Sequence, residues 1–255
     1  MIPRLHPDFL TKPLAHRGLH DVAAGRPENS RAAIRAAIAG GYGIEIDLQL
    51  SADKTPMVFH DYALDRLTGE TGPVQVLSAD QLGTIALSHG NEGIPTLVEV
   101  LELVAGQTPL LIEIKDQDGA MGKNVGPLEK ATAELLAGYD GPVAVMSFNP
   151  HCVALMAELL PDVPRGIVTS SYQTQDWPLS QEICDHLRGI PDFKRANASF
   201  ISHEMADLER ARVGELKAAG ANILCWTVKS ATQEVKAREV ADNITFEQYL
   251  ADTRR

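Results

Sequence analysis

Residues 42–50 read Tyr-Gly-Ile-Glu-Ile-Asp-Leu-Gln-Leu, so aliphatic and polar side chains alternate along this stretch. A period of two is that of a β-strand, in which successive side chains point to opposite faces. Ile44 and Ile46 share one face, and Glu45 and Asp47 share the other. Acidic residues are unusual on a buried strand, so we expect the acidic face to line a functional mouth.

A strand and a helix are predicted upstream of this stretch. Residues 12–18 predict a short buried strand that ends in glycine. The motif Arg-Pro-Glu-Asn-Ser at residues 26–30 supplies cap and first-turn residues for a helix over residues 31–39. Gly40 and Gly41 then stop that helix.

Strands and helices continue to alternate downstream, with one interruption. Residues 55–60 predict a short extended piece, and the irregular, glycine-rich residues 62–95 predict an insertion. Further helices are predicted over residues 96–104, 126–136, 150–160, 179–187, 208–219 and 231–237. Further strands are predicted over residues 109–115, 143–148, 166–170, 198–202, 222–228 and 242–245.

About eight such alternations predict a (β/α)8 TIM barrel with a small insertion after the second strand. A chain of 255 residues fits one barrel, so a single domain over residues 1–255 is expected. An open, doubly wound sheet is the rival. The first strand-to-helix junction lacks GxGxxG, which weakens the dinucleotide-binding version of that rival without excluding the others.

Charge restricts the partners of the chain. With 23 basic and 34 acidic residues, its formal net charge is -11, and such a field repels nucleic acids and anionic lipid surfaces. A small anion can still bind where a metal ion and a few cationic side chains reverse the local potential. We therefore expect a small-molecule substrate and no nucleic-acid partner. The sequence leaves the oligomeric state open.

Cysteines and apolar runs bear on the cellular compartment. Cys152, Cys184 and Cys225 are widely separated and form no CxxC pair, which predicts reduced thiols without a zinc site or disulfide framework. Residues 1–10 carry prolines and charges where a signal peptide has an apolar core, and no apolar run approaches the ~18 residues of a membrane helix. A cytoplasmic protein without stable membrane insertion is expected.

Three acidic residues predict a metal site. Glu45 and Asp47 lie two apart on one strand, so their side chains emerge on the same face roughly 7 Å apart. Glu113 occupies the same kind of position on the third strand. Such carboxylates repel one another unless a cation lies between them, and oxygen ligands favour Mg²⁺ or Ca²⁺ over zinc. A solvated strand end or an ion pair is the alternative for each acid.

Six short motifs carry a resemblance to a known family. In order they are LAHRG at residues 14–18, PENS at 27–30, IEIDL at 44–48, VFHD at 58–61, LIEIK at 111–115 and WTV at 226–228. In this order and spacing, they resemble the glycerophosphodiester phosphodiesterase family, from about residue 14 to about residue 244. The resemblance implies a barrel enzyme of glycerol and lipid metabolism, and it places Glu45, Asp47 and Glu113 at the metal-ligand positions.

The two histidines in these motifs are the candidate proton-transfer groups. Histidine titrates near neutral pH, so His16 and His60 can supply the base and the acid that cleavage of a phosphodiester requires. The family motifs HRG and HD imply the same two roles, but the sequence does not tell acid from base. A buried, hydrogen-bonded histidine is the alternative for either residue.

Five further residues are expected to contact the substrate. Arg17 has a rigid fork suited to two phosphate oxygens, and Lys115 supplies a point charge, although ion pairs with neighbouring acids are an alternative for both. In the family, the Pro-Glu-Asn stretch lies at the active site, which implies a role for Glu28, although capping alone would explain the asparagine. Phe148 is expected at the mouth. Trp226 matches the family's WTVN stretch, but Lys229 replaces its asparagine.

The leading hypothesis is a metal-dependent hydrolase that cleaves a glycerophosphodiester to glycerol 3-phosphate and an alcohol such as choline or ethanolamine, as the resemblance implies. A variant is a lyase that uses the adjacent glycerol hydroxyl and yields a cyclic phosphate. A degenerate barrel that only binds a phosphorylated ligand is the non-enzyme alternative. A zinc amidohydrolase would begin with His-x-His on the first strand, where this chain has His16-Arg17-Gly18.

Overall fold

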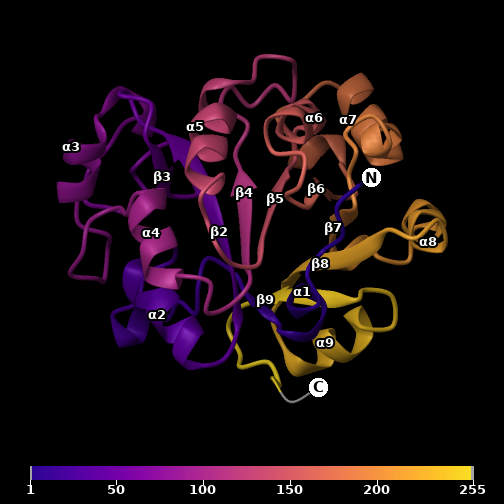
Figure 1. Ribbon diagram of the computed structural model, residues 1–255, viewed down its shortest axis with the longest axis horizontal. Coiled ribbons are helices and arrows are strands. Elements are labelled where there is room, and N and C mark those ends of the chain that lie inside the picture. Colours follow the sequence, from indigo (N-terminus) through magenta and orange to yellow (C-terminus); the bar gives the residue numbers. More distant parts are fainter. Residues whose placement is uncertain (1, 254–255) are drawn as a thin grey trace.

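The computed structural model describes residues 2–253, and its eight parallel strands close into a barrel (Figure 1). These strands are β1 (Leu14–Ala15), β2 (Gly43–Leu50), β4 (Leu110–Ile114), β5 (Val143–Ser147), β6 (Arg165–Thr169), β7 (Phe200–Glu204), β8 (Asn222–Val228) and β9 (Asn243–Phe246). The barrel closes because the short β1 pairs with β2 on one side and with β9 on the other. The predicted (β/α)8 TIM barrel is confirmed.

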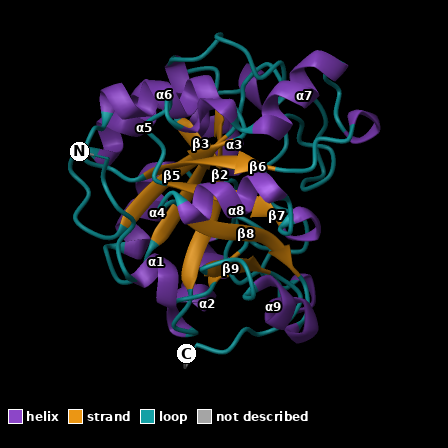
Figure 2. Ribbon diagram, turned by 90° about the vertical axis from the view of Figure 1, so that its right-hand side faces the viewer, coloured by secondary structure: helices purple, strands orange, loops and turns teal. Residues whose placement is uncertain are grey.

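Helices between successive strands surround the barrel (Figures 1 and 2). These helices are α2 (Arg31–Ala39), α4 (Leu97–Val104), α5 (Pro127–Leu136), α6 (Pro150–Leu159), α7 (Gln181–Gly189), α8 (Ala211–Ala218) and α9 (Ala231–Ala237). All seven coincide with helices predicted from the sequence. Two short helices, α1 (Asp8–Thr11) and α3 (Ala79–Thr84), were not predicted.

Helix α2 shows why local sequence chemistry predicts these elements well. The hydroxyl of Ser30 accepts a hydrogen bond from the backbone N–H of Ala33, which caps the start of α2. On the turn before it, Gly18 has a φ of 77°, and a Cβ there would lie 2.9 Å from Ala33. Glycine is therefore required where β1 passes under α2.

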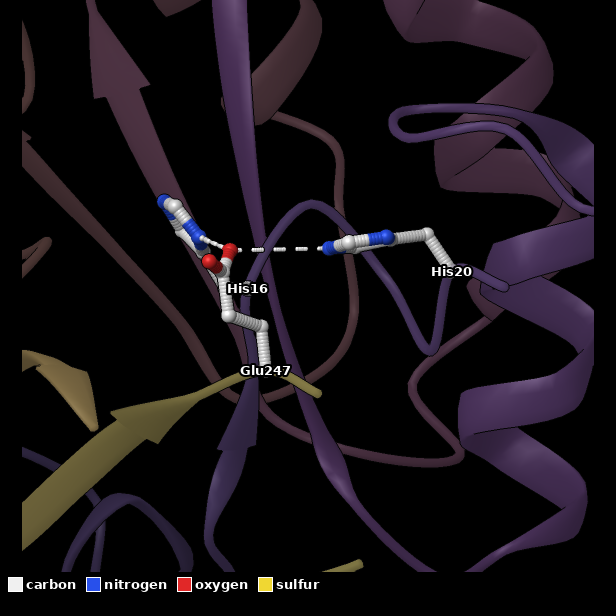
Figure 3. A group of neighbouring side chains, drawn as sticks. All are labelled: His16, His20 and Glu247. Carbon is white, nitrogen blue, oxygen red and sulfur yellow. Dashed lines mark hydrogen bonds and ion pairs between the residues drawn. The ribbon is translucent and has the colours of Figure 1, made fainter. Parts of the chain in front are cut away.

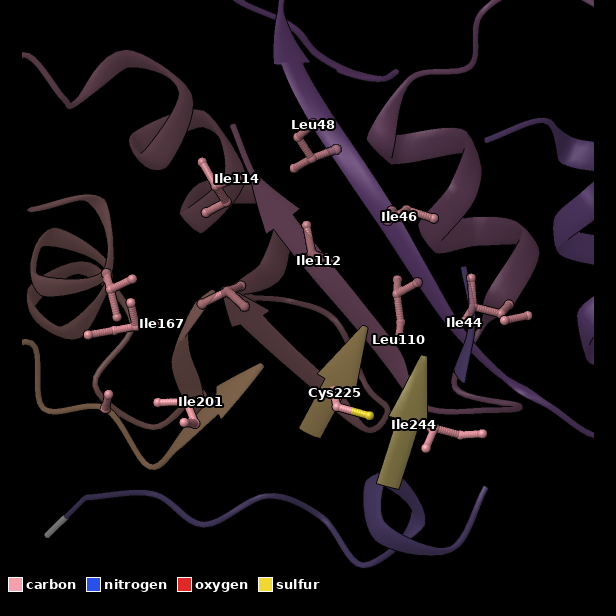
Figure 4. Packing of buried hydrophobic residues seen from close by; sticks show 14 of the residues in the cluster. Ile44, Ile46, Leu48, Leu110, Ile112, Ile114, Ile167, Ile201, Cys225 and Ile244 are labelled. Atoms are coloured by element: carbon pink, nitrogen blue, oxygen red, sulfur yellow. The ribbon is translucent and has the colours of Figure 1, made fainter. Parts of the chain in front are cut away.

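The outward face of the strands packs against the helices (Figure 4). Ile44 and Ile46 of β2 and Ile112 of β4 are fully buried in this layer. They belong to the same apolar cluster as Ile34 of α2 and Val100 of α4. The aliphatic face expected from the period of two is thus the face that the helices cover, and the acidic face points into the barrel.

The inside of the barrel is apolar at its amino-terminal end. Leu14, Leu111, Phe200 and Leu224 form a buried cluster there, together with Phe9 of α1. The α1 segment is tied to the barrel because the side-chain amide of Asn243 donates to the backbone carbonyls of Phe9 (2.8 Å) and Lys12 (2.6 Å). Four residues are too few for a periodic pattern, which is why the sequence did not reveal this helix.

The insertion after β2 is anchored by strand β3 (Pro56–Val58), which pairs antiparallel with β2. This strand confirms the extended piece expected at residues 55–60. The segment that follows carries α3, at the left edge of the molecule in Figure 1. It has an apolar cluster of its own, formed by Met57, Phe59, Leu64, Val74, Leu82, Leu87 and Ile94.

Two further features of the described residues are the state of the cysteines and the character of the helices. Cys152, Cys184 and Cys225 are free, buried thiols. Within residues 2–253, no helix combines the length and the apolar character needed to cross a membrane.

We expect replacement of Phe9 by alanine to lower the free energy of unfolding by about 3–5 kcal/mol, because the ring is fully buried at the base of the barrel. Urea unfolding followed by circular dichroism measures this change. The control is Val235→Ala on the exposed side of α9, which we expect to change the free energy of unfolding by no more than about 0.5 kcal/mol. Equal effects in the two variants would contradict a packing role for α1.

Candidate active site

Three buried carboxylates meet at the carboxyl-terminal end of the barrel. Asp47 on β2 pairs in register with Glu113 on β4, and Glu45 lies two residues earlier on β2. All three side chains are buried, and one carboxylate oxygen from each lies within 4.8 Å of the others. The period of two places Glu45 and Asp47 on one face, and the parallel register adds Glu113 to them.

Two cationic side chains lie against these carboxylates. The ammonium of Lys115 is 3.1 Å from Asp47 Oδ1 and 2.7 Å from Glu113 Oε1. Arg17 Nε is 3.3 Å from Asp47 Oδ2, and the backbone N–H of Arg17 donates to Glu45 Oε2 at 3.0 Å. Three ionised carboxylates against two cations leave one negative charge in excess, in a place where water screens poorly. A divalent cation fits this charge balance.

The pKa values follow from this crowding. Burial raises the pKa of Glu45 well above its usual range, and the charges of Asp47 and Glu113 raise it further. Burial also acts to raise the pKa of Asp47, but Lys115, His60 and Arg17 outweigh it and hold that pKa well below its usual range. The surroundings of Glu45 therefore favour its protonated form.

The donor set suits a hard cation. Carboxylate oxygens are the ligands that Mg²⁺ and Ca²⁺ prefer, whereas zinc favours nitrogen and sulfur. Glu45, Asp47 and Glu113 are the residues that would hold such an ion, and Glu45 would give up its proton to it.

Each candidate histidine is held by a carboxylate on its Nδ1 atom. Glu247 Oε2 accepts from His16 at 2.6 Å, and Asp61 Oδ1 accepts from His60 at 2.6 Å. An ionised carboxylate only accepts hydrogen bonds, so it places the proton on Nδ1 and leaves Nε2 for a reacting group. Burial lowers the pKa of His16 despite its hydrogen bond to Glu247, so this ring is neutral near neutral pH.

A chain of ion pairs connects the insertion to the barrel mouth. Arg66, from the insertion, pairs with Asp61 (2.7 Å) and with Glu28 (2.9 Å). Glu28 Oε1 in turn accepts from Arg17 Nη1 at 2.6 Å. Burial alone would raise the pKa of Glu28, but Arg66 and Arg17 outweigh it and lower that pKa. Glu28 thus contacts Arg17 from outside the cavity, and a role in binding substrate remains a prediction.

The three carboxylates, the two cationic side chains and the two histidines line a cavity of about 410 Å³. Its polar side contains His16, Arg17, Glu45, Asp47, His60, Asp61, Glu113 and Lys115. Its apolar lining includes Met121, Met146, Phe148, Val168, Trp177 and Trp226. The ring of Phe148 lies 5.2 Å from that of Trp177 and 5.5 Å, edge to face, from that of Trp226. Of the ten site residues named from the sequence, nine line this cavity, and Glu28 does not.

Local backbone geometry positions the cationic side of the cavity. Arg17 (φ 56°) and Asn29 (φ 58°) both have left-handed backbones, which are strained for residues other than glycine. The backbone N–H of Asn29 donates to the carbonyl of Arg17 at 2.8 Å, and its side-chain amide donates to Asp47 at 3.0 Å. The two strained residues therefore hold each other against the carboxylates.

Sequence reasoning missed several groups at the site. Glu247 follows β9, in a segment where the sequence predicted no site residue. Its second oxygen lies 2.9 Å from Lys229, the residue that stands where the family has asparagine. Asp61 was visible beside His60, but its hydrogen bond to that ring was not. No motif or periodic pattern in the sequence pointed to Trp177, because it lies in an irregular loop.

Comparisons with known proteins agree with this geometry. The model of the glycerophosphoryl diester phosphodiesterase family matches residues 16–246. The chain is 28% identical over 226 residues to YhdW of Bacillus subtilis, provisionally named a glycerophosphodiester phosphodiesterase, covering 85% of this chain and 86% of that protein. It is 31% identical over 169 residues to the glycerophosphodiester phosphodiesterase of Bacillus altitudinis, covering 63% of this chain and 67% of that protein.

A solved structure is similar over nearly the whole chain. A phosphodiesterase of Oleispira antarctica, determined in complex with the product sn-glycerol-3-phosphate, superimposes with a TM-score of 0.74 at 25% sequence identity. The match covers 96% of this chain and 93% of that one.

We expect binding of Mg²⁺ or Ca²⁺ to release a proton, because the pKa of Glu45 is raised and the ion requires an ionised carboxylate. Affinity for the ion should therefore increase with pH until Glu45 is ionised without it. Calorimetry in buffers of different ionisation enthalpy measures the proton count. Glu45→Gln should release fewer protons than the wild type, and equal release would assign the proton to another group.

Proposed function

Because the chain belongs to the glycerophosphoryl diester phosphodiesterase family, we propose that it hydrolyses glycerophosphodiesters to glycerol 3-phosphate and an alcohol. The observation that carries this proposal is a single cavity with three clustered carboxylates, two cationic side chains and two carboxylate-held histidines. The product bound in the Oleispira antarctica phosphodiesterase supports glycerol phosphate as the common part of the substrate. The alcohol group stays open.

Charge stabilisation at the phosphate is the first requirement of the reaction. A divalent cation held by Glu45, Asp47 and Glu113 would neutralise charge on the phosphate oxygens. Arg17 offers two N–H groups in a fixed fork, and Lys115 offers a point charge on the same side of the cavity. Both cations are buried among carboxylates, so their positions are set before substrate enters.

Proton transfer is the second requirement. We assign His16 as the base that activates the nucleophile, because burial lowers its pKa and Glu247 leaves Nε2 unprotonated. His60 is then the acid that protonates the departing alcohol. Its side chain is 30% exposed, against 15% for His16, so it can regain its proton from solvent. Asp61 stabilises the protonated ring of His60.

The apolar side of the cavity is the binding surface for the alcohol group. Phe148, Trp177 and Trp226 form a continuous group of aromatic rings in the lining of the cavity. Trp226 is fixed because its indole N–H donates to the backbone carbonyl of Ser202 at 3.0 Å. Glu28 acts through Arg17, which it orients toward the phosphate. The cytoplasmic location, the single domain over residues 1–255 and the lack of a nucleic-acid partner stay predictions from the sequence.

Phosphorus NMR with glycerophosphocholine and glycerophosphoethanolamine tests the reaction. The purified protein is incubated with Mg²⁺, with Ca²⁺ and with EDTA, beside a Glu45→Ala variant. We expect glycerol 3-phosphate only with a cation and only from the unmutated protein. A cyclic phosphate that persists would identify the lyase variant, and no turnover with either ion would contradict activity on these two substrates.

Leaving-group dependence tests the assignment of acid and base. A p-nitrophenyl phosphodiester of glycerol needs no acid, because p-nitrophenolate leaves unprotonated. We expect His60→Ala to lose roughly 10²–10⁴-fold in kcat on glycerophosphocholine but far less on the activated substrate. His16→Ala should lose activity on both. The opposite pattern would exchange the two roles.

A further inference from the structure

Figure 3 shows a second group of side chains whose chemistry could hold a metal ion. It consists of His16, His20 from the turn after β1, and Glu247 from the segment after β9. Glu247 Oε2 lies 2.6 Å from His16 Nδ1 and 3.6 Å from His20 Nε2. One ligand atom from each residue lies within 4.8 Å of the other two. The segments that follow the first barrel strand, β1, and the last, β9, thus bring these three side chains together.

The Nε2 atom of His20 is the ring nitrogen that lies nearest to Glu247 Oε2. Its Nε2 is buried and has no hydrogen-bond partner among the described residues, because 3.6 Å to Glu247 is too long for a hydrogen bond. A buried, unsatisfied ring nitrogen carries a free-energy penalty in the free protein. A metal ion between His20, His16 and Glu247 would remove that penalty.

Two residues of the group also line a hollow other than the catalytic cavity. A separate hollow of about 560 Å³ is lined by His20 and Glu247, together with residues 18–22 and 246–250 and Arg26. Its lining shares no residue with that of the catalytic cavity, where His16 lies. His16 therefore presents Nδ1 toward Glu247 while its ring also borders the place of reaction.

We propose that His16 Nδ1, His20 Nε2 and Glu247 Oε2 form a second metal site, for Zn²⁺ or a similar borderline ion, and that its occupation stops turnover. Two imidazoles and one carboxylate match the ligand set that zinc accepts with three protein ligands and an open position. Mg²⁺ and Ca²⁺ prefer the all-oxygen group of Glu45, Asp47 and Glu113. Lys229 holds the other oxygen of Glu247 at 2.9 Å, which leaves Oε2 for the ion.

The inhibitory part rests on the proposed function of His16. In the free protein, the Nδ1 proton of His16 faces Glu247 and the lone pair of Nε2 is available. An ion on Nδ1 needs the lone pair of that atom, so the single proton of the neutral ring moves to Nε2. Nε2 then has no lone pair to accept a proton from the nucleophile. No net proton is gained or lost by the neutral ring in this exchange.

Metal binding is measured first, independently of activity. The full chain, with Mg²⁺ in large excess to fill the carboxylate group, is titrated with Co²⁺ by visible absorption and with Zn²⁺ by calorimetry. We expect one ion per chain, and Co²⁺ bands as intense as those of four- or five-coordinate sites. His20→Gln should weaken this binding by about tenfold or more, since a direct ligand is lost. His186→Gln, which changes a surface histidine paired with Asp192, should bind as the wild type does.

Activity is measured second, with glycerophosphocholine and Mg²⁺. We expect Zn²⁺ to inhibit the wild type and His186→Gln alike. His20→Gln should turn over as fast as the wild type without Zn²⁺ and should need about tenfold more of it for the same inhibition. Unchanged inhibition in His20→Gln would place the inhibitory ion on the carboxylates and overturn the proposal.

The two measurements separate the site from the function. If His20-dependent Co²⁺ binding occurs but no phosphodiester is cleaved, the metal site stands and the proposed function fails. If the substrate is cleaved but no ion binds in excess Mg²⁺, or the His20→Gln variant binds it equally well, the second site is overturned alone.

Discussion

Mutual repulsion among three carboxylates in the barrel mouth is the constraint on which the rest of the site depends. Asp47 and Glu113 face each other in register on adjacent strands, and Glu45 is on the same inward face. Ionised together in a poorly hydrated place, they would oppose folding. Lys115 and Arg17 offset two of the three charges. Burial and the remaining excess of negative charge raise the pKa of Glu45, and a divalent cation would fit this charge balance.

The barrel tolerates this polar mouth because its base is apolar and closed. Phe9, Phe200 and Leu224 belong to the apolar cluster inside its amino-terminal end. Helices cover the outward face of every long strand, so the aliphatic half of each strand is buried independently of the site. The amino-terminal ends of the strands therefore contribute to stability and their carboxyl-terminal ends carry the active site, as is usual for parallel barrels.

Ion pairs also connect the active site to the insertion. Arg66 bridges Asp61 and Glu28, and Glu28 holds Arg17. His60, its partner Asp61 and Arg17 are thereby linked through one insertion residue. The insertion thus contributes to the active site through charges, while its own apolar cluster keeps it folded against β2. On the other side, Glu247 and Lys229 form a comparable pair beside His16.

The sequence by itself determined the barrel, the presence of its seven surrounding helices and the positions of the carboxylates, histidines and cations along the strands, since these depend on short-range signals. The period of two in β2, the cap at Ser30 and the HRG and HD motifs are each contained within a few residues. Only the tertiary structure decided that Glu247, 231 residues from His16, accepts from its ring, and that His20 joins them. It also decided that Glu28 faces Arg17 and Arg66 instead of the cavity. Barrel closure brings β1 beside β9, and no local pattern encodes which side chains meet across that seam.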